Sequence, residues 1–254
     1  QVENDLAVWP PSCEADGILQ RGCLMFLSRA VPRQDVWSNP EMLDLFESSY
    51  AIHQAVWGFF IGDPDKERDF LYRYDSKNGE PVVYIVSKTK PVSQRGVWIV
   101  DSKEYAPVLS KGDILGFSVR VNPVITRSFT NEKTGKSVHK RHDVVMDYKT
   151  KCREDGKPFS YEAAMSEAGT QWLVSRSEKH GFSVHVSSLV VEQYERRVFA
   201  KPTESGKKKE AVIATMDLTG VLEVTDSEKF LEILYSGIGP AKGFGCGLML
   251  VKRM

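Results

Sequence analysis

The side chains best suited to chemistry in this sequence are Tyr50 and His53, which stand three residues apart in an aromatic and apolar run. On a helix this spacing places both side chains on one face. An imidazole titrates near pH 7 and a phenol can donate a hydrogen bond or a proton, so the pair could transfer protons. The same spacing also fits a packed, hydrogen-bonded core histidine. The spacing alone does not choose between the two interpretations.

The remaining histidines show no metal-ligand pattern. His139 and His142 flank a basic pair, and His180 precedes a glycine at an expected helix end. His185 lies in an expected strand. The motif HExxH is absent, and none of the four cysteines forms a CxxC pair. We therefore expect no metal site and no cofactor, and we interpret the cysteines as thiols of a reducing cytoplasm.

The segment 237–247 is the most unusual local feature, with five glycines in eleven residues. Glycine lets the backbone turn tightly and approach a ligand closely. The segment matches neither GxGxxG nor the Walker pattern, and it follows an expected helix where a phosphate-binding loop would precede one. It could be a helix end with a tight connection, or a backbone surface that lies against RNA with Lys242 on a phosphate.

The elements that must position these residues follow the same order in both halves. In the first half we expect strands at 24–31, 69–75, 82–87 and 97–101. A helix is expected over 41–60, with Asn39 as its N-cap and Pro40 at its first position, and Asn78-Gly79 marks a hairpin turn. In the second half we expect strands at 115–125, 183–199, 211–224 and 246–252 and helices at 160–180 and 227–236. A polar basic loop is expected to run from the first of these strands to about 141. Strand, helix, strand, strand, helix, strand is the ferredoxin-like order.

Charge is distributed unevenly although the chain is neutral overall, with 34 Lys+Arg and 34 Asp+Glu. Residues 127–157 hold nine basic and five acidic residues, 194–209 hold six and two, and 41–69 hold two and seven. A polyanion would therefore meet the second half of the chain. The alternative is that these segments are only solvated loops.

Length and composition set broad limits. The 254 residues allow one large domain or two smaller ones, and 41% hydrophobic with 27% charged residues is typical of a globular protein. No run approaches 18 apolar residues, so a membrane span is not expected. Residues 1–23 lack the pattern of a secretory signal, and we interpret them as an extension or linker outside the fold.

Several segments together resemble the CasE family, the CRISPR RNA-processing endoribonucleases of type I-E Cascade complexes. The glycine-rich segment SGIGPAKGFGCGLMLVKR resembles that family's C-terminal signature, MFLSRAV at 25–31 resembles its first strand, and YAIHQAVWGFF at 50–60 resembles its histidine-bearing helix. The resemblance covers about residues 24–254. It implies two tandem ferredoxin-like (RRM-like) domains, an α+β fold, which we place at 24–115 and 116–254.

The resemblance also implies an activity. Members of the family cut repeat RNA at the base of a hairpin without metal, leave a 2′,3′-cyclic phosphate, and stay on the hairpin as a Cascade subunit. The family's catalytic tyrosine and histidine fall on Tyr50 and His53, and its Arg-x-Asn-Pro strand falls on Arg120 and Asn122. A basic side chain should lie near the phosphate, and Arg68 and Lys242 are the candidates.

The RNA stem should be bound by basic residues of the second half, because proteins contact A-form RNA mainly through its shape and backbone. With Arg120, Asn122 and Lys242, the expected set is Arg127, Lys133, Lys136, Lys140, Arg141, Arg196, Arg197, Lys207, Lys208 and Lys209. Expected partners are the CRISPR repeat hairpin and other Cascade subunits in the cytoplasm, with no membrane. Two alternatives stay open: a subunit that binds the RNA hairpin without cutting it, and a ferredoxin-like scaffold that binds only protein.

Overall fold

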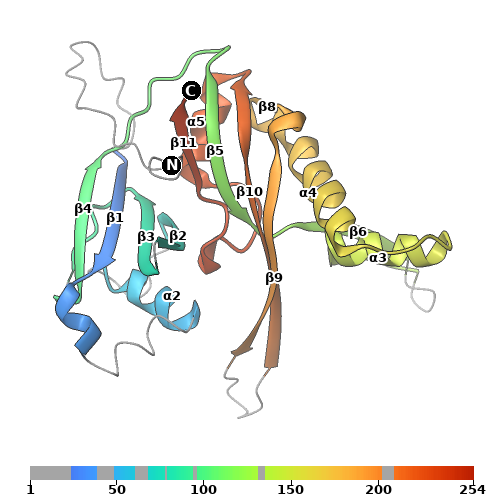
Figure 1. Cartoon of the computed structure of the whole chain (residues 1–254), viewed down its shortest axis with the longest axis horizontal. Helices are drawn as coiled ribbons and strands as arrows, with labels where there is room; N and C mark the ends of the chain where they lie inside the picture. Colours follow the sequence, from blue (N-terminus) through green and yellow to red (C-terminus); the bar gives the residue numbers. More distant parts are fainter. Residues whose placement is uncertain are drawn as a thin grey trace.

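Two antiparallel sheets and a separate two-stranded hairpin form the protein (Figure 1). The computed structural model describes residues 24–38, 49–60, 68–77, 79–93, 96–130, 135–201 and 209–254. The strands of the first sheet lie within residues 26–104, and those of the second lie within 114–253. The expected helix start at Asn39 and Pro40 lies outside the described residues, as does Asn78 of the hairpin turn.

The first sheet has the strand order β2-β3-β1-β4, and every neighbouring pair is antiparallel. Its elements are β1 (Phe26–Pro32), η1 (Gln34–Ser38), α2 (Ser49–Trp57), β2 (Phe70–Lys77), β3 (Glu80–Ser87) and β4 (Trp98–Glu104). This is the ferredoxin-like arrangement. The second helix of that motif has no counterpart in the described residues between β3 and β4.

The helix α2 packs on this sheet through residues one turn apart. Ile52 and Val56 are 2% and 0% exposed, and they belong to one core cluster with Ala30, Val83 and Ile85 of the strands. Burying residues at positions i and i+4 fixes which side of a helix faces a sheet. The residue beside Ile52 is His53, so the packing of the helix also sets the direction in which the histidine lies.

The second sheet has the order β11-β5-β10-β8, and β9 pairs with β10 beside β8. Its strands and helices are β5 (Ile114–Val121), α4 (Tyr161–Ser177), η2 (Glu178–His180), β8 (Phe182–Val184), η3 (Val186–Ser188), β9 (Val190–Lys201), β10 (Lys209–Val224), α5 (Ser227–Ser236), η4 (Lys242–Phe244) and β11 (Met249–Arg253). The helices α4 and α5 bury Trp172, Leu173, Phe230 and Leu234 in one core with strand residues. The predicted tandem ferredoxin-like fold is confirmed.

The prediction of a basic loop up to about residue 141 is wrong. The chain instead forms a hairpin of β6 (Val124–Thr130) and β7 (Ser137–Asp143), followed by α3 (Val144–Glu154). The hairpin is hard to recognise because most of its side chains are polar and exposed, so the apolar alternation of a half-buried strand is absent. The helix starts at Asp143, whose carboxylate accepts hydrogen bonds from the backbone N–H groups of Val145 and Met146.

Two expected strands are divided in the structure. The strand expected over 115–125 stops at Val121 and restarts at Val124, because Pro123 between them has no N–H for a sheet hydrogen bond. The strand expected over 183–199 is interrupted by η3. The helix expected over 227–236 is confirmed as α5, and the one expected over 160–180 is confirmed as α4 with η2.

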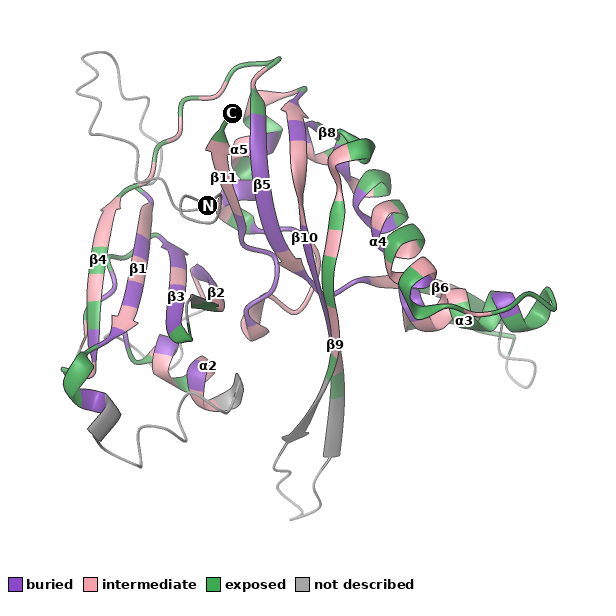
Figure 2. Cartoon of the chain, in the orientation of Figure 1, coloured by how far each residue is buried: buried purple, intermediate pink, exposed green. Residues whose placement is uncertain are grey.

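The two sheets are joined by a small apolar cluster of their own. Met25, Leu71 and Val86 of the first part are buried with Leu248 of the second. Figure 2 shows β3 and β5 as largely purple, buried strands, one in each sheet. The segment after α5 therefore lies against the first domain, and this contact brings the glycine-rich segment to α2.

Candidate active site

The helix α2 presents His53 at the edge of its buried side. The His53 ring is half buried and lies edge-on to Trp57, one turn further along, with ring centroids 6.3 Å apart. Tyr50 lies three residues before His53 in the same helix, as predicted, but its side chain is outside the described part of the chain. The geometry of the site is therefore built around His53.

The glycine-rich segment of the second domain forms one wall around this histidine. It leaves α5 at Gly237 and includes η4, which contacts both α2 and β2. Phe244 stacks on His53, with ring centroids 5.9 Å apart and an interplanar angle of 18°. Tyr72 of β2 approaches the same imidazole, at 6.3 Å between ring centroids. The imidazole thus lies where the two domains meet.

Two glycines bring the backbone of this segment close to side chains of the first domain. A Cβ built on Gly243 would lie 2.8 Å from Nη1 of Arg68, and one built on Gly245 would lie 3.3 Å from the ring of Tyr72. Both separations are tighter than ordinary van der Waals contact. A Cβ at Gly243 would therefore push the end of the Arg68 side chain aside, whereas Gly245 also has a φ of +78°, which favours glycine.

Burial and one hydrogen bond control the protonation of His53. Desolvation by burial lowers its pKa, a hydrogen bond to the Gly243 backbone opposes this, and the positive charge of Arg68 lowers the pKa further. The Tyr72 hydroxyl donates to the Gly243 carbonyl oxygen at 3.1 Å, and burial raises the pKa of Tyr72. Near neutral pH the site therefore holds an uncharged imidazole and an uncharged phenol.

Two cations, one from each domain, lie close to each other here, and the charge of Arg68 also acts on His53. Arg68 precedes β2, and Lys242 begins η4. Burial lowers the pKa of both groups, and the charge of Arg68 lowers the pKa of Lys242 further. Among the residues that the structure describes, neither cation forms an ion pair with a carboxylate. Two desolvated like charges side by side are unfavourable on their own and create a favourable position for an anion.

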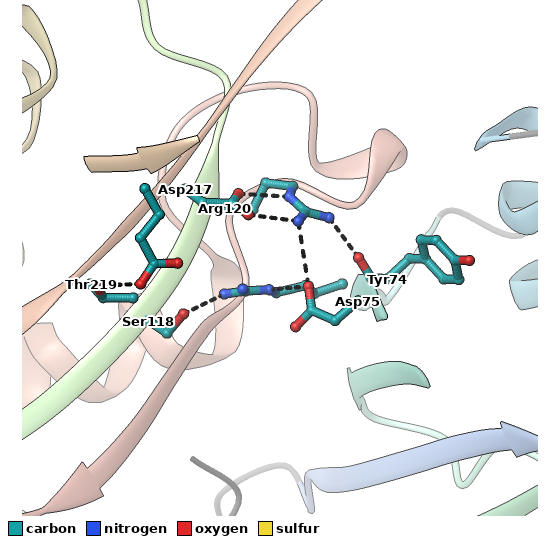
Figure 3. A network of polar contacts seen from close by, with 8 residues as sticks. Tyr74, Asp75, Ser118, Arg120, Asp217 and Thr219 are labelled. Atoms are coloured by element: carbon teal, nitrogen blue, oxygen red, sulfur yellow. Dashed lines mark hydrogen bonds and ion pairs between the residues drawn. The ribbon is translucent and has the colours of Figure 1, made fainter. Parts of the chain in front are cut away.

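Arg120 lies in a buried network between the domains (Figure 3). Its guanidinium donates to Asp217 through two bonds of 2.7 Å and to the carbonyl oxygen of Tyr74 at 2.5 Å, and it lies 3.5 Å from Asp75. Arg73 completes the network by donating to Asp75 at 2.8 Å and to Ser118 at 2.9 Å.

Asn122 is also buried, and its Nδ2 donates to the carbonyl oxygen of Ala214 at 2.6 Å. Sequence reasoning placed both Arg120 and Asn122 in the RNA-binding set. Their partners favour a structural role: Arg120 joins β5 to β2, and Asn122 joins the end of β5 to β10.

The other basic candidates lie on projecting strands. Lys136, Lys140 and Arg141 are exposed on or beside β7, and Arg196 is exposed on β9. Arg127 of β6 is partly exposed and pairs with Asp147 of α3 at 2.6 Å. Lys133, Lys207 and Lys208 lie outside the described residues, as do the side chains of Arg197 and Lys209. The described members are thus spread along the projecting strands and are not gathered at His53.

Sequence reasoning missed two side chains of the site, Tyr72 and Phe244. Tyr72 reads as an ordinary buried aromatic residue of a strand, and Phe244 is the single aromatic residue of the glycine-rich segment. The only available signal was Phe244, because a large ring among five glycines has few local partners and must pack against another element.

Neither a metal-binding cluster nor a membrane-spanning helix is found among the described residues. No group of three or more His, Cys, Asp or Glu residues within that part of the chain is arranged to hold a metal ion. No helix in the same part combines the length and the apolar character that a membrane crossing requires.

Fold and site together define the class of protein: two tandem ferredoxin-like domains that meet around a half-buried histidine, with Arg68 and Lys242 close to each other at the same contact. A family model described as CRISPR associated protein matches residues 25–253. The chain therefore belongs to this CRISPR-associated family, the family of CasE.

Individual relatives agree over nearly the whole length. The chain is 30% identical over 227 residues to the CRISPR system Cascade subunit CasE of Escherichia coli K12, which covers 89% of this chain and 98% of the relative. It is similar in fold to Cse3 of Thermus thermophilus bound to an RNA representing a pre-cleavage complex, with TM-score 0.59, 22% identity, and coverage of 91% and 100%. It is also similar in fold to Cas6e of Escherichia coli K-12, with TM-score 0.53, 24% identity, and coverage of 90% and 100%.

Proposed function

We propose that this protein is a metal-independent endoribonuclease that cleaves CRISPR repeat RNA at the base of its hairpin and stays bound to the product as a Cascade subunit. The observation that carries the proposal is the half-buried imidazole of His53 at the contact between the domains, with Arg68 close enough to lower its pKa and Lys242 of the other domain close to Arg68. A histidine can transfer protons, and two adjacent cations can bind a phosphate. Together they match the needs of RNA backbone cleavage.

The relatives support the same reaction class. One is named as a Cascade subunit, and structures of another show a CRISPR endoribonuclease bound to RNA. The chain spans these relatives nearly completely, so their overall architecture is present here.

In the proposed reaction the RNA supplies its own nucleophile. The 2′-hydroxyl oxygen bonds to the adjacent phosphorus, the bond from phosphorus to the 5′-oxygen breaks, and a 2′,3′-cyclic phosphate remains. One proton must leave the 2′-hydroxyl and one must reach the departing 5′-oxygen. His53 and Tyr50 share these two transfers. Burial keeps the pKa of His53 below its ordinary value, which favours the neutral imidazole that can accept a proton.

The charge that develops on the phosphate is offset by Arg68 and Lys242. Fixed charges in a partly desolvated site stabilise developing charge more strongly than the same groups in water. The glycine-rich segment lets the Lys242 backbone lie against the first domain, so the two cations can contact one phosphate from two sides. Because this arrangement needs neither an activated water nor a bound ion, we expect activity in the presence of a chelator.

Binding of the stem is assigned to the projecting strands. Exposed Lys136, Lys140 and Arg141 lie along or beside β7, and Arg196 lies on β9. Basic side chains spread along two strands suit the extended backbone of an RNA helix better than one small ligand. We expect the bound hairpin to anchor the protein to the other Cascade subunits.

The test is cleavage of a labelled repeat hairpin in EDTA. Wild-type protein should cut it, and His53→Ala should lower the rate at saturating RNA at least about a hundredfold while affinity stays nearly unchanged. His185→Ala is the matched control, because His185 is exposed and belongs to the turn before η3. It should cut at the wild-type rate.

A second substrate tests the nucleophile. A single 2′-deoxy substitution 5′ of the scissile phosphate should stop cleavage and leave binding intact, because stem contacts elsewhere remain. Cleavage of the deoxy substrate, or loss of activity in EDTA that a divalent metal restores, would contradict the mechanism. Tight binding of the hairpin by wild-type protein with no cleavage would establish the alternative, a subunit that only binds RNA.

A further inference from the structure

The buried phenol of Tyr72 makes a polar contact across the domain interface. Tyr72 belongs to β2 of the first domain and is 2% exposed. Its hydroxyl donates to the carbonyl oxygen of Gly243, in η4 of the second domain, at 3.1 Å. A buried hydroxyl needs a partner, and a backbone carbonyl has two lone pairs to offer. The bond therefore satisfies Tyr72 and leaves Gly243 able to accept a second one.

His53 uses the backbone of the same residue. The hydrogen bond between His53 and Gly243 raises the pKa of the imidazole, so it favours the protonated ring. Only an acceptor has this effect, and the group involved is therefore the Gly243 carbonyl oxygen. The segment that Tyr72 holds at Gly243 therefore faces the imidazole, and the ring of the next residue, Phe244, stacks on His53 with centroids 5.9 Å apart. The position of η4 thus decides how these groups meet the imidazole.

Tyr72 is well suited to hold that carbonyl. It lies on the edge strand β2 and pairs with Ile85 of the inner strand β3, so its backbone is fixed by the sheet. Its ring lies so close to Gly245 that an added Cβ there would be 3.3 Å away. Burial also raises the pKa of the phenol, so the hydroxyl keeps its proton and stays a donor near neutral pH.

We propose that Tyr72 is a positioning residue for RNA cleavage: it holds η4 at the Gly243 carbonyl, and η4 in turn holds the imidazole of His53 through the stacked ring of Phe244. The inference rests on the proposed function, because it assumes that His53 takes part in the reaction. Tyr72 itself does not touch the RNA. It fixes the glycine-rich segment of one domain against the catalytic helix of the other.

The test is Tyr72→Phe, which removes only the hydroxyl. At saturating repeat hairpin the cleavage rate should fall about tenfold, since small misplacements of a reacting group are costly, and the Kd for the hairpin should stay within about twofold of wild type. The pKa of His53, followed by NMR as the resonance missing from His53→Ala, should fall because the carbonyl is no longer held. Tyr235→Phe is the matched control, since the Tyr235 hydroxyl makes a similar bond of 2.9 Å to the carbonyl oxygen of Tyr105.

The outcomes separate the inference from the proposed function. A wild-type rate and wild-type titration of His53 in Tyr72→Phe would overturn the positioning role. Equal losses of rate in Tyr72→Phe and Tyr235→Phe would also overturn it, because they would indicate general loosening of the domains. If wild-type protein does not cleave, the proposed function fails, and the titration of His53 in the two variants still decides whether Tyr72 holds the ring.

Discussion

Replacing Gly243 by alanine should displace the Arg68 guanidinium and leave the fold intact. The added methyl group would lie 2.8 Å from Nη1 of Arg68, which is the end of a flexible side chain. Gly243 does not have a left-handed φ, so the substitution adds no backbone strain. The free energy of unfolding should therefore change by less than about 1 kcal/mol.

The effect on catalysis should be larger. Removing a donor that stabilises developing charge costs about 2.7–4 kcal/mol in an enclosed site. Arg68 is displaced and not removed, so part of its interaction with the phosphate survives. We expect a loss of about 1.4–2.7 kcal/mol in transition-state stabilisation, which corresponds to a tenfold to hundredfold lower rate at saturating RNA.

Single-turnover cleavage and thermal unfolding measure the two effects separately. Gly247→Ala is the contrasting variant, because Gly247 has a φ of +92° and its added Cβ would lie 2.8 Å from the backbone oxygen of Ile238. That contact cannot relax by moving a side-chain end. Gly247→Ala should lose at least about 2 kcal/mol of folding stability, whereas Gly243→Ala should unfold at nearly the wild-type temperature.

A double-mutant cycle gives the decisive comparison. If Gly243→Ala acts through Arg68, then adding it to Arg68→Gln should cause no further loss of rate. Fully additive losses would show that the methyl group acts elsewhere. A wild-type rate in both single variants would refute the assignment of Arg68 to the scissile phosphate.

Two further predictions concern the interface between the domains and the binding of RNA. Arg120→Met should lower the free energy of unfolding by about 3 kcal/mol, because it leaves the buried carboxylate of Asp217 without its cation; an unchanged urea midpoint with weaker RNA binding would instead make Arg120 an RNA contact. Neutralising Lys136, Lys140 and Arg141 together should weaken hairpin binding and reduce the slope of log affinity against log salt by up to about two to three units, since each phosphate contact releases counterions. The control variant neutralises three exposed lysines of connecting segments, Lys88, Lys90 and Lys111, and should leave that slope unchanged. An unchanged slope in both variants would show that β7 does not contact the RNA.

Much of the fold follows from local patterns. Asp226 before an apolar helical repeat predicts α5 with its observed bounds, because an N-cap and a periodic apolar face are properties of neighbouring residues. The helix that carries Tyr50 and His53 and the order of elements along the first half of the chain were predictable for the same reason. The β6–β7 hairpin was not, because its exposed strands bury little apolar surface and lack the alternation that marks a strand.

The sequence by itself identified the candidate residues for chemistry and the elements on which they stand. Tyr50 and His53 lie on one predicted helix. Lys242 lies in a segment whose glycines predict that its backbone approaches another group closely. These are statements about neighbours in the chain, and the resemblance to CasE supplied the catalytic assignment that spacing alone left open.

Only the tertiary structure decided what surrounds His53. Phe244 and Gly243 reach it from nearly 200 residues further along the chain, and they bring Lys242 close to Arg68. Tyr72 approaches the same imidazole from β2. Arg120 was predicted to bind RNA, whereas its contacts favour a structural role. The sequence did not indicate this, because its partner Asp217 belongs to a strand 97 residues away. Contacts between domains depend on the packing of whole sheets, so no local pattern in the sequence encodes them.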